Sequence, residues 1–189
     1  TGTCFGLLGP NGAGKTTTIR MMQAQMTPTS GSLTVLGMDA AAKPREVKAR
    51  VGIVPQENNL DPDFTVHKNL TVYSRFFGIP AATADERATK LLEFVQLTDK
   101  SGALIAELSG GMKRRLNLAC GVLHEPKVVL LDEPTVGVDP QSRERIHEML
   151  GGLRAQGSAL LLTTHQLEEA EGRADRIVVV GHEIGRAHV

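Results

Sequence analysis

Residues 9–17 have the sequence Gly9-Pro10-Asn11-Gly12-Ala13-Gly14-Lys15-Thr16-Thr17, whose first eight positions fit the pattern G-x-x-x-x-G-K-[ST] of a phosphate-binding loop. The apolar run 5–8 before it predicts a buried strand. Residues 15–26 after it contain no glycine or proline and predict a helix. Because strand, loop and helix follow one another as the pattern requires, a phosphate site is favoured over an ordinary glycine-rich turn.

The residue types of this loop suit a nucleotide with several phosphates. Glycines at positions 12 and 14 would let backbone N–H groups approach phosphate oxygens, and the N-terminus of the next helix adds partial positive charge. Lys15 would contact the β and γ phosphates, and the hydroxyl of Thr16 would bind Mg²⁺. All nine residues of the loop are therefore expected to line the nucleotide site.

Composition and charge narrow the classes of protein that this chain could be. Its 189 residues, 41% hydrophobic and 22% charged, suit one globular domain with a buried core. Lys and Arg total 21, as do Asp and Glu, so no overall basic field favours nucleic acid as a partner. Cys4 and Cys120 lie in apolar runs and are expected to be small core residues in a reducing cytosol. Neither a signal peptide nor an apolar run long enough to span a membrane is present in this sequence.

The rest of the chain alternates strand-like and helix-like segments, which predicts an α/β fold with a mainly parallel sheet flanked by helices. Expected strands are 32–36, 51–54, 128–131, 159–162 and 177–180, and 37–44 is a polar connector. Expected helices are 45–50, 65–77, 85–97, 109–124 and 140–156. The segment of about 57–125 therefore forms an inserted all-helical subdomain. Gln56 follows a strand end, which is where ligands bind in open α/β sheets.

Two adjacent carboxylates, Asp132 and Glu133, follow the apolar strand 128–131. They should therefore lie at the same sheet edge as the phosphate-binding loop. Asp132 would orient Mg²⁺, and Glu133 would polarise the attacking water or accept its proton. An exposed acidic turn is the alternative for an isolated Asp-Glu pair, but the buried strand and the upstream loop argue against it here.

Ser109-Gly110-Gly111 opens the helix 109–124 and resembles a second anion-binding site, with a hydroxyl and free N–H groups. One chain rarely needs two phosphate sites. We therefore expect this segment to meet the nucleotide held by a second copy, in a homodimer with ATP at its interface. The alternative is an ordinary serine cap with glycines that allow tight packing.

Together these motifs resemble, in content and order, those of ATP-binding cassette (ABC) ATPases, whose fold is that of the P-loop NTPases. The resemblance covers nearly the whole chain. Within the family, three segments look most like the ATPases of nodulation lipo-oligosaccharide exporters and daunorubicin-type resistance pumps. They are Pro55-Gln56-Glu57-Asn58-Asn59-Leu60-Asp61, Met112-Lys113-Arg114-Arg115-Leu116 and Thr163-Thr164-His165.

The resemblance implies a role for each motif residue. Gln56 would be the Q-loop residue that links Mg²⁺ and the attacking water to the membrane partner. Residues 109–111 would form the signature that faces the γ-phosphate of the other subunit. Asp139 would be the D-loop carboxylate, and His165 the switch histidine. A lone histidine after a strand is more often structural, but its place after Thr163-Thr164 favours the functional role here.

The chain departs from the family pattern in three places. Met112 occupies the signature position where the family usually has glutamine. The aromatic residue that stacks on adenine in the family lies further upstream, so no base-stacking residue is assigned. Residues 183–189 match the translation of a sequencing adapter and are set aside as a tail. The expected domain is therefore 1–182, truncated at both ends.

Two other clusters have ordinary interpretations. Lys113, Arg114 and Arg115 are expected to form a solvated helix face rather than a nucleic-acid contact. Tyr73, Phe76 and Phe77 are expected to belong to the core, with a docking surface for a membrane subunit as the alternative.

The resemblance implies an ATPase subunit of an ABC exporter. It would hydrolyse MgATP between two cassettes and act on separate integral-membrane permease subunits, at the inner face of the cell membrane. The alternative is a soluble ABC protein that acts on ribosomes or DNA, although no sustained heptads indicate the coiled coil of the DNA-repair relatives. A GTPase or small-molecule kinase would leave Ser109-Gly110-Gly111 unexplained.

Overall fold

A computed structural model describes residues 2–181 of the chain. The expected tail 183–189 lies outside these described residues. The centre of the fold is a five-stranded sheet with the order β4-β5-β6-β1-β7, and every neighbouring pair in it is parallel. Since neighbouring strands are parallel, the chain must cross over between them, and the crossover helices cover the faces of the sheet. The expected α/β class is confirmed.

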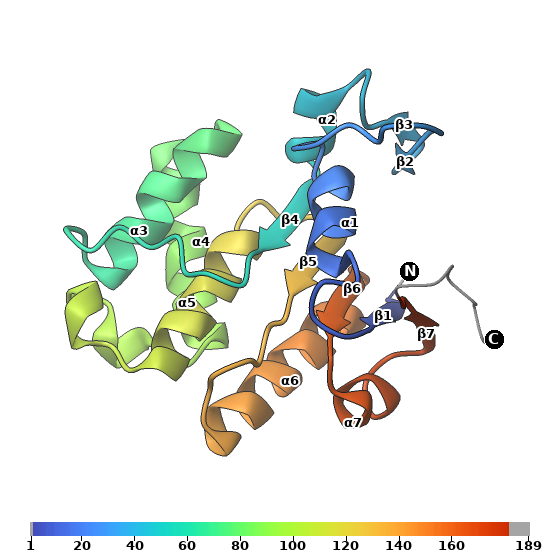
Figure 1. The fold of residues 1–189 in the computed structure, drawn as a ribbon. Coiled ribbons are helices and arrows are strands. Elements are labelled where there is room, and N and C mark those ends of the chain that lie inside the picture. The colour runs from blue at the N-terminus through green and yellow to red at the C-terminus, as the bar shows by residue number, and fades with distance from the viewer. Residues whose placement is uncertain (1, 182–189) are drawn as a thin grey trace.

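The elements follow the order in Figure 1. The sheet strands are β1 (Cys4–Leu8), β4 (Val51–Val54), β5 (Val128–Asp132), β6 (Ala159–Thr164) and β7 (Arg176–Val179). The helices are α1 (Lys15–Met22), α2 (Pro44–Lys48), α3 (Val66–Tyr73), α4 (Ala81–Phe94), α5 (Gly110–Val122), α6 (Pro140–Ala155) and α7 (Leu167–Glu171). Three 3-10 helices are η1 (Ser74–Phe77), η2 (Thr98–Lys100) and η3 (Ile105–Glu107).

Alternating side chains of β5 divide the core into two clusters, because successive residues of a strand face opposite sides of the sheet. Val129 and Leu131 pack with residues of α5 and α6, whereas Leu130 packs with Ile19 of α1 and Val51 of β4. The side chains of Val129, Leu130 and Leu131 are fully buried. The sheet is therefore covered on both faces, with α1 on one side and α6 on the other in Figure 1.

A short hairpin, β2 (Thr34–Val35) and β3 (Met38–Asp39), lies beside α2. Leu36 and Gly37 form its turn, with φ values of 51° and 74°. Two residues with positive φ are what a tight hairpin turn needs. The sequence prediction of a polar connector over 37–44 was therefore wrong for β3, because a two-residue strand is too short to show a periodic pattern.

Helices α3, α4 and the start of α5 gather on the left of Figure 1, away from α1 and the hairpin. None of the described strands lies within 57–125. The side chains of Thr65 and Ser109 accept hydrogen bonds from the backbone N–H groups of Lys68 and Met112, so both predicted helix caps are confirmed. In residues 2–181, no helix has both the length and the apolar character needed to cross a bilayer.

The aromatic cluster of this helical part is only partly core. Tyr73 packs against the main hydrophobic cluster, and the ring of Phe77 stacks on His124 with centroids 3.9 Å apart. Phe76 is 80% exposed, so the expectation of a core position was wrong for this residue. It lies in the short 3-10 helix η1, where its ring meets that of Tyr73 edge to face, with centroids 5.8 Å apart.

Candidate functional site

The sheet topology brings the predicted motifs to one edge. Because β1, β4, β5 and β6 are parallel, the segments that follow them all leave from the carboxyl ends of the strands. The register places Leu8, Thr164 and Asp132 at nearly the same level across three neighbouring strands. The phosphate-binding loop, Asp132, Glu133 and His165 therefore start from adjacent positions.

The backbone of the phosphate-binding loop is shaped by its glycines. Gly12 has a φ of 84° and Gly14 a φ of 95°, in the left-handed region that glycine adopts readily. The first-turn N–H groups of any helix have no intrahelical partner. Gly14, the N-cap of α1, has no side chain that could accept hydrogen bonds from them. Such groups bind an anion well. The loop has the geometry of a phosphate site.

Gly9 is needed for another reason. A Cβ atom there would lie 2.3 Å from the backbone oxygen of Val180, closer than side-chain atoms approach in real structures. Its N–H donates to the carbonyl oxygen of Thr164, at 3.2 Å. The first glycine of the motif thus allows the chain after β7 to pass close to the loop.

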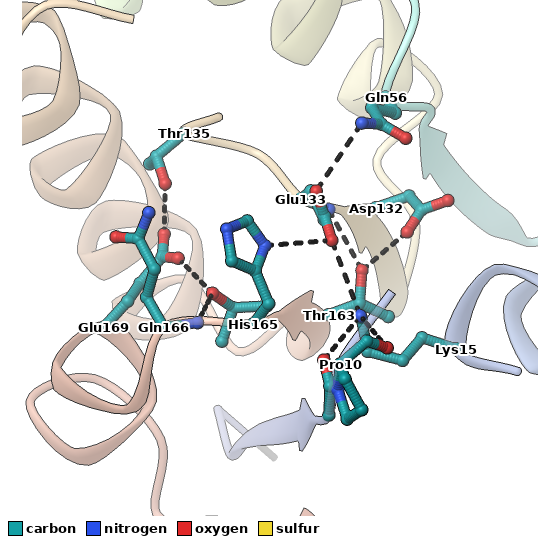
Figure 2. Close-up of polar contacts among 12 residues, drawn as sticks. Pro10, Lys15, Gln56, Asp132, Glu133, Thr135, Thr163, His165, Gln166 and Glu169 are labelled. Carbon is teal, nitrogen blue, oxygen red and sulfur yellow. Dashed lines mark hydrogen bonds and ion pairs between the residues drawn. The ribbon is translucent and has the colours of Figure 1, made fainter. Parts of the chain in front are cut away.

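Lys15 lies under the loop and is only 5% exposed. Its ammonium donates to the carbonyl oxygens of Gly9, at 2.7 Å, and Pro10, at 3.2 Å. It also forms an ion pair with Glu133, at 3.5 Å between Nζ and Oε1. Figure 2 shows the ammonium between the loop and the acidic pair. One buried cation is therefore shared between the loop and the end of β5.

Asp132 is buried at the end of β5, and its Oδ1 accepts a 2.6 Å hydrogen bond from the hydroxyl of Thr163. The same hydroxyl accepts from the backbone N–H of Glu133, at 3.0 Å. Thr163 on β6 thus orients both acidic residues, and sequence reasoning did not assign it this role. Thr163 lies opposite Asp132 in the parallel register of β5 and β6. The sequence could not indicate this contact, because it depends on which strands are neighbours in the sheet.

The oxygen ligands for Mg²⁺ in this site are few. No group of three or more His, Cys, Asp or Glu side chains in the described residues could hold a metal ion. Magnesium usually takes one or two carboxylates together with phosphate oxygens of its substrate and water. The buried carboxylate of Asp132 and the Thr16 hydroxyl at the start of α1 fit an ion that arrives with a nucleotide.

Glu133 is the centre of the polar contacts in Figure 2. Its Oε1 lies 3.2 Å from Nδ1 of His165, in addition to the Lys15 contact. Its Oε2 accepts from the side-chain amide of Gln56, at 3.5 Å. The side chain is 9% exposed and its backbone has a φ of 45°. A non-glycine residue in this region is strained, and the surrounding contacts must hold it there.

His165 is supported by a buried cluster that was not predicted. Glu169 of α7 accepts hydrogen bonds from the hydroxyls of Thr135 and of Thr164, the latter at 2.6 Å. The Thr164 hydroxyl also accepts from the N–H of Gln166, at 3.0 Å. The residues on both sides of His165 are therefore fixed, although its own ring is 35% exposed. Figure 2 shows this cluster beside the ring.

Residues 109–111 and Asp139 lie together but apart from Lys15. Asp139 caps α6 by accepting from the N–H of Ser142, at 2.9 Å, and the hydrogen bonds from Ser142 lower the pKa of its carboxyl. A Cβ on Gly111 would lie 2.1 Å from the hydroxyl of Ser142. Among the described residues, no hydrogen bond or ion pair joins this group to the phosphate-binding loop.

Gly110 differs from its neighbour. A Cβ atom there would meet nothing within 4 Å, and its residue is exposed. The packing of this chain therefore requires glycine at position 111 but not at position 110. The tight packing given as the alternative for these glycines is found at Gly111, and the contact of Gly110 with a second molecule stays a prediction.

The prediction of a solvated basic face was wrong for two of its three residues. Arg114 is 4% exposed and Arg115 is 3% exposed, whereas Lys113 lies at the margin of the buried region. Arg115 donates to the carbonyl oxygens of Val95 and Gln96 at the end of α4. Every residue from 114 to 122 is buried, because α5 passes between the sheet and the other helices.

A family model described as "ABC transporter" matches residues 1–136. The chain belongs to the ABC transporter family. Two curated members are similar over nearly all of it. "Nod factor export ATP-binding protein I" of Burkholderia orbicola (strain AU 1054) is 50% identical over 179 residues, which are 95% of this chain and 59% of that protein. The protein of that name from Paraburkholderia xenovorans (strain LB400) is 51% identical over the same shares.

The chain thus spans about 59% of the length of these curated relatives. A solved structure, "Structure of ATP binding subunit of ABC transporter", is also similar, with a TM-score of 0.84 and 28% identity. The match covers 98% of this chain and 79% of that one. The ABC fold, a parallel-sheet P-loop core flanked by helices, is therefore confirmed.

Proposed function

We propose that this ABC chain binds and hydrolyses MgATP as the ATP-binding subunit of an exporter. The observation that carries the proposal is the arrangement around Glu133, where one buried carboxylate meets Lys15, Gln56 and His165 at the mouth of the phosphate-binding loop. A general base between a phosphate site and a histidine is suited to activate water for phosphoryl transfer.

The loop binds the triphosphate first. Its first-turn N–H groups and the ammonium of Lys15 face the phosphates, so the ammonium exchanges the carbonyl oxygens of Gly9 and Pro10 for phosphate oxygens. This exchange also weakens the contact between Lys15 and Glu133. The carboxylate is then free to accept a proton from water.

Hydrolysis follows by attack of that water on the γ-phosphorus. A bond forms between the water oxygen and phosphorus, the bond from phosphorus to the β–γ bridging oxygen breaks, and the proton of water passes to Glu133. His165 and Gln56 hold the two oxygens of the carboxylate in position during this step. Thr16, Asp132 and Gln56 would hold Mg²⁺, which would neutralise part of the negative charge of the phosphates.

The site is completed by a second copy of the chain. Gly110 is exposed and has space around it, so the signature N-terminus of α5 is open to the γ-phosphate bound by another subunit. Ser109 and Gly111 keep that N-terminus in shape, by capping and by packing on Ser142. Asp139 fixes the start of α6 beside them. The dimer therefore has two shared sites.

The export role rests on the relatives. Proteins about 50% identical to this chain are named as ATP-binding proteins for Nod factor export, which supports an exporter with a separate membrane-spanning part. The chain then works in the cytoplasm at the inner face of the cell membrane, against permease subunits. Co-purification of the full-length protein with ribosomes, and not with a membrane protein, would favour the soluble alternative.

Hydrolysis is tested with Glu133→Gln in the full-length protein. We expect the affinity for MgATP to be kept and kcat to fall by roughly two orders of magnitude or more, since one general base is lost. Glu168→Gln is the matched control, because Glu168 is an exposed carboxylate on α7. Near-normal turnover in Glu133→Gln would remove this residue from the role of base.

The shared site is tested by mixing two inactive variants. Gly110→Asp brings a negative charge to the opposing γ-phosphate, and Lys15→Ala removes the phosphate partner. Each variant alone should be inactive. A heterodimer should regain one active site, which combines the intact phosphate-binding loop of the Gly110→Asp chain with the intact signature of the Lys15→Ala chain. A mixture that stays inactive although heterodimers form would refute the shared site.

A further inference from the structure

Arg114 is a buried cation without an acidic partner. No carboxylate in the part of the chain that the structure describes forms an ion pair with it, and burial lowers the pKa of its guanidinium to about 10. Burying an unpaired charge is unfavourable unless hydrogen bonds compensate. The side chain must therefore find other acceptors.

The acceptors are five backbone carbonyl oxygens from two separate loops. Nη1 donates to Pro55 and, at 3.0 Å, to Gln56, and Nη2 donates to Asp132, at 3.0 Å, and Glu133, at 3.1 Å. Nε donates to Pro134, at 2.7 Å. Gln56, Asp132 and Glu133 are the residues outside the phosphate-binding loop that were predicted to bind Mg²⁺ or to act on the attacking water. The backbone carbonyl oxygens of all three accept hydrogen bonds from this one guanidinium.

The planar guanidinium fork is suited to this task, because its donors have a fixed mutual geometry. Two loops that both contact it are held at a fixed separation. The side-chain contact between Gln56 and Glu133 spans the same two loops, at 3.5 Å. Glu133 also has a strained backbone, with a φ of 45°, which needs outside contacts to persist. Arg114 supplies one of them at the Glu133 carbonyl.

Arg114 is also one helical turn from Gly110, the open residue at the start of α5. The turn between them is regular helix with Ser109 as its cap, so a displacement at the N-terminus of α5 carries the arginine with it. Asn117, one turn further, donates to the carbonyl oxygens of Pro55 and Glu57 at 3.4 and 3.5 Å. The helix thus contacts the Gln56 loop from two consecutive turns.

We propose that Arg114 is a positioning residue that transmits contact at the N-terminus of α5 to Gln56 and Glu133 of the same chain. When a second subunit's phosphate seats on Gly110, α5 shifts, and the guanidinium sets the distance between the two loops for hydrolysis. This inference rests on the proposed ATPase function. It adds a link between the shared interface and the base that neither motif provides alone.

Arg115 offers a matched control within the same helix. It is equally buried and also donates to backbone carbonyl oxygens, but those belong to Val95 and Gln96, far along the chain from the acidic pair. Replacing either arginine by lysine keeps the charge and removes the fork. A general packing effect should therefore appear in both variants, and an effect on hydrolysis in only one.

The experiment compares Arg114→Lys and Arg115→Lys in the full-length protein, with kcat, the Kd for MgATP and the melting temperature measured for each. For Arg114→Lys we expect kcat to fall about tenfold or more while the Kd stays within about twofold, because misplacement of reacting groups lowers turnover without removing phosphate contacts. For Arg115→Lys we expect a melting temperature change and a kcat within about twofold of the wild type.

Three outcomes would overturn the inference. These are an unchanged kcat in folded Arg114→Lys, an equal loss of kcat in both variants, and a loss of ATP affinity in Arg114→Lys that matches its loss of kcat. A wild-type protein that does not hydrolyse ATP would instead refute the proposed function. The two failures are therefore distinguishable.

A measurement on the wild type covers the case in which Arg114→Lys does not fold. Amide hydrogen exchange is followed with and without a non-hydrolysable ATP analogue, at dimer-forming concentration. We expect protection to rise together at the start of α5, at Gln56 and at Glu133. Protection of α5 without any change in the two loops would contradict the inference.

Discussion

Replacement of Gly111 by alanine should destabilise the protein, whereas the same change at Gly110 should not. The added Cβ at Gly111 would lie 2.1 Å from Oγ and 2.6 Å from Cβ of Ser142, and 3.3 Å from Oδ2 of Asp139. At Gly110 it would meet no atom within 4 Å. Two adjacent glycines of one motif therefore have opposite packing environments, which makes each a control for the other.

The magnitude follows from these contacts. Inserting one methyl group into a packed site costs about 1–3 kcal/mol, and alanine recovers up to about 1 kcal/mol of that in a helix. We expect a net loss of about 2 kcal/mol for Gly111→Ala, which lowers the melting temperature by about 4–8 °C for a domain of this size. Gly110→Ala should melt at the wild-type temperature or slightly above it.

Differential scanning calorimetry and urea unfolding of the full-length protein would measure both variants. Ser142→Gly removes both close contacts, so combined with Gly111→Ala it should restore about 1 kcal/mol or more relative to the sum of the single changes. A Gly111→Ala protein as stable as the wild type, or a double variant that shows no coupling, would refute this packing argument. Reduced ATPase activity in a stable Gly110→Ala protein would fit a contact with a second subunit.

Three further changes test the phosphate-binding loop, the Glu169 cluster and the buried His124. Lys15→Ala should weaken MgATP binding roughly ten- to a hundredfold, since the phosphates lose a charged donor, and an unchanged Kd by fluorescence titration would contradict the phosphate site. Glu169→Ala leaves two buried hydroxyls without their acceptor and should cost about 2–3 kcal/mol in urea unfolding, against about 0.5 kcal/mol or less for the exposed Glu168→Ala. Burial lowers the pKa of His124 to about 4, below its value in the unfolded chain. The neutral ring therefore contributes fully to the free energy of unfolding above about pH 6.5, and this contribution is lost as the pH falls towards 4. Between pH 7 and pH 5 this group should remove about 2 kcal/mol of stability, and a His124→Phe protein with the same pH dependence as the wild type would show that it does not.

The sequence predicted the elements of the core well because their signals are local. Apolar runs followed by glycine, proline or acidic residues mark β1, β4 and β5, and an apolar run before Thr163-Thr164-His165 marks β6. The hydroxyls of Thr65 and Ser109 mark two helix starts. The core positions predicted for Cys4 and Cys120 are also confirmed, since both are buried and free, and burial raises the pKa of their thiols to about 11 and about 12. Each of these features depends on a few neighbouring residues.

Other features depend on contacts between distant segments. The burial of Arg114 could not be predicted from three consecutive basic residues, because it results from α5 passing beneath two loops that lie far away in the sequence. The same holds for Glu169, whose partners Thr135 and Thr164 come from different elements. Helix α7 is only five residues long and gave no periodic signal. The roles of Gln56 and His165 stay predictions until they are tested.

The position of β1 in the sheet has a consequence for how the protein folds during synthesis. Cys4 pairs with Leu160, and Phe5 pairs with Arg176, so the first strand must wait for nearly the whole domain before it has either neighbour. At ribosomal rates of about 5–20 residues per second, that interval is roughly 10–30 seconds. The phosphate-binding loop is therefore translated long before β6 and β7 can fix it in place, and a nascent chain that stops short of β6 should lack a nucleotide site. Codon changes that slow translation between α5 and β6 would lengthen the time during which this loop is exposed to proteases and chaperones.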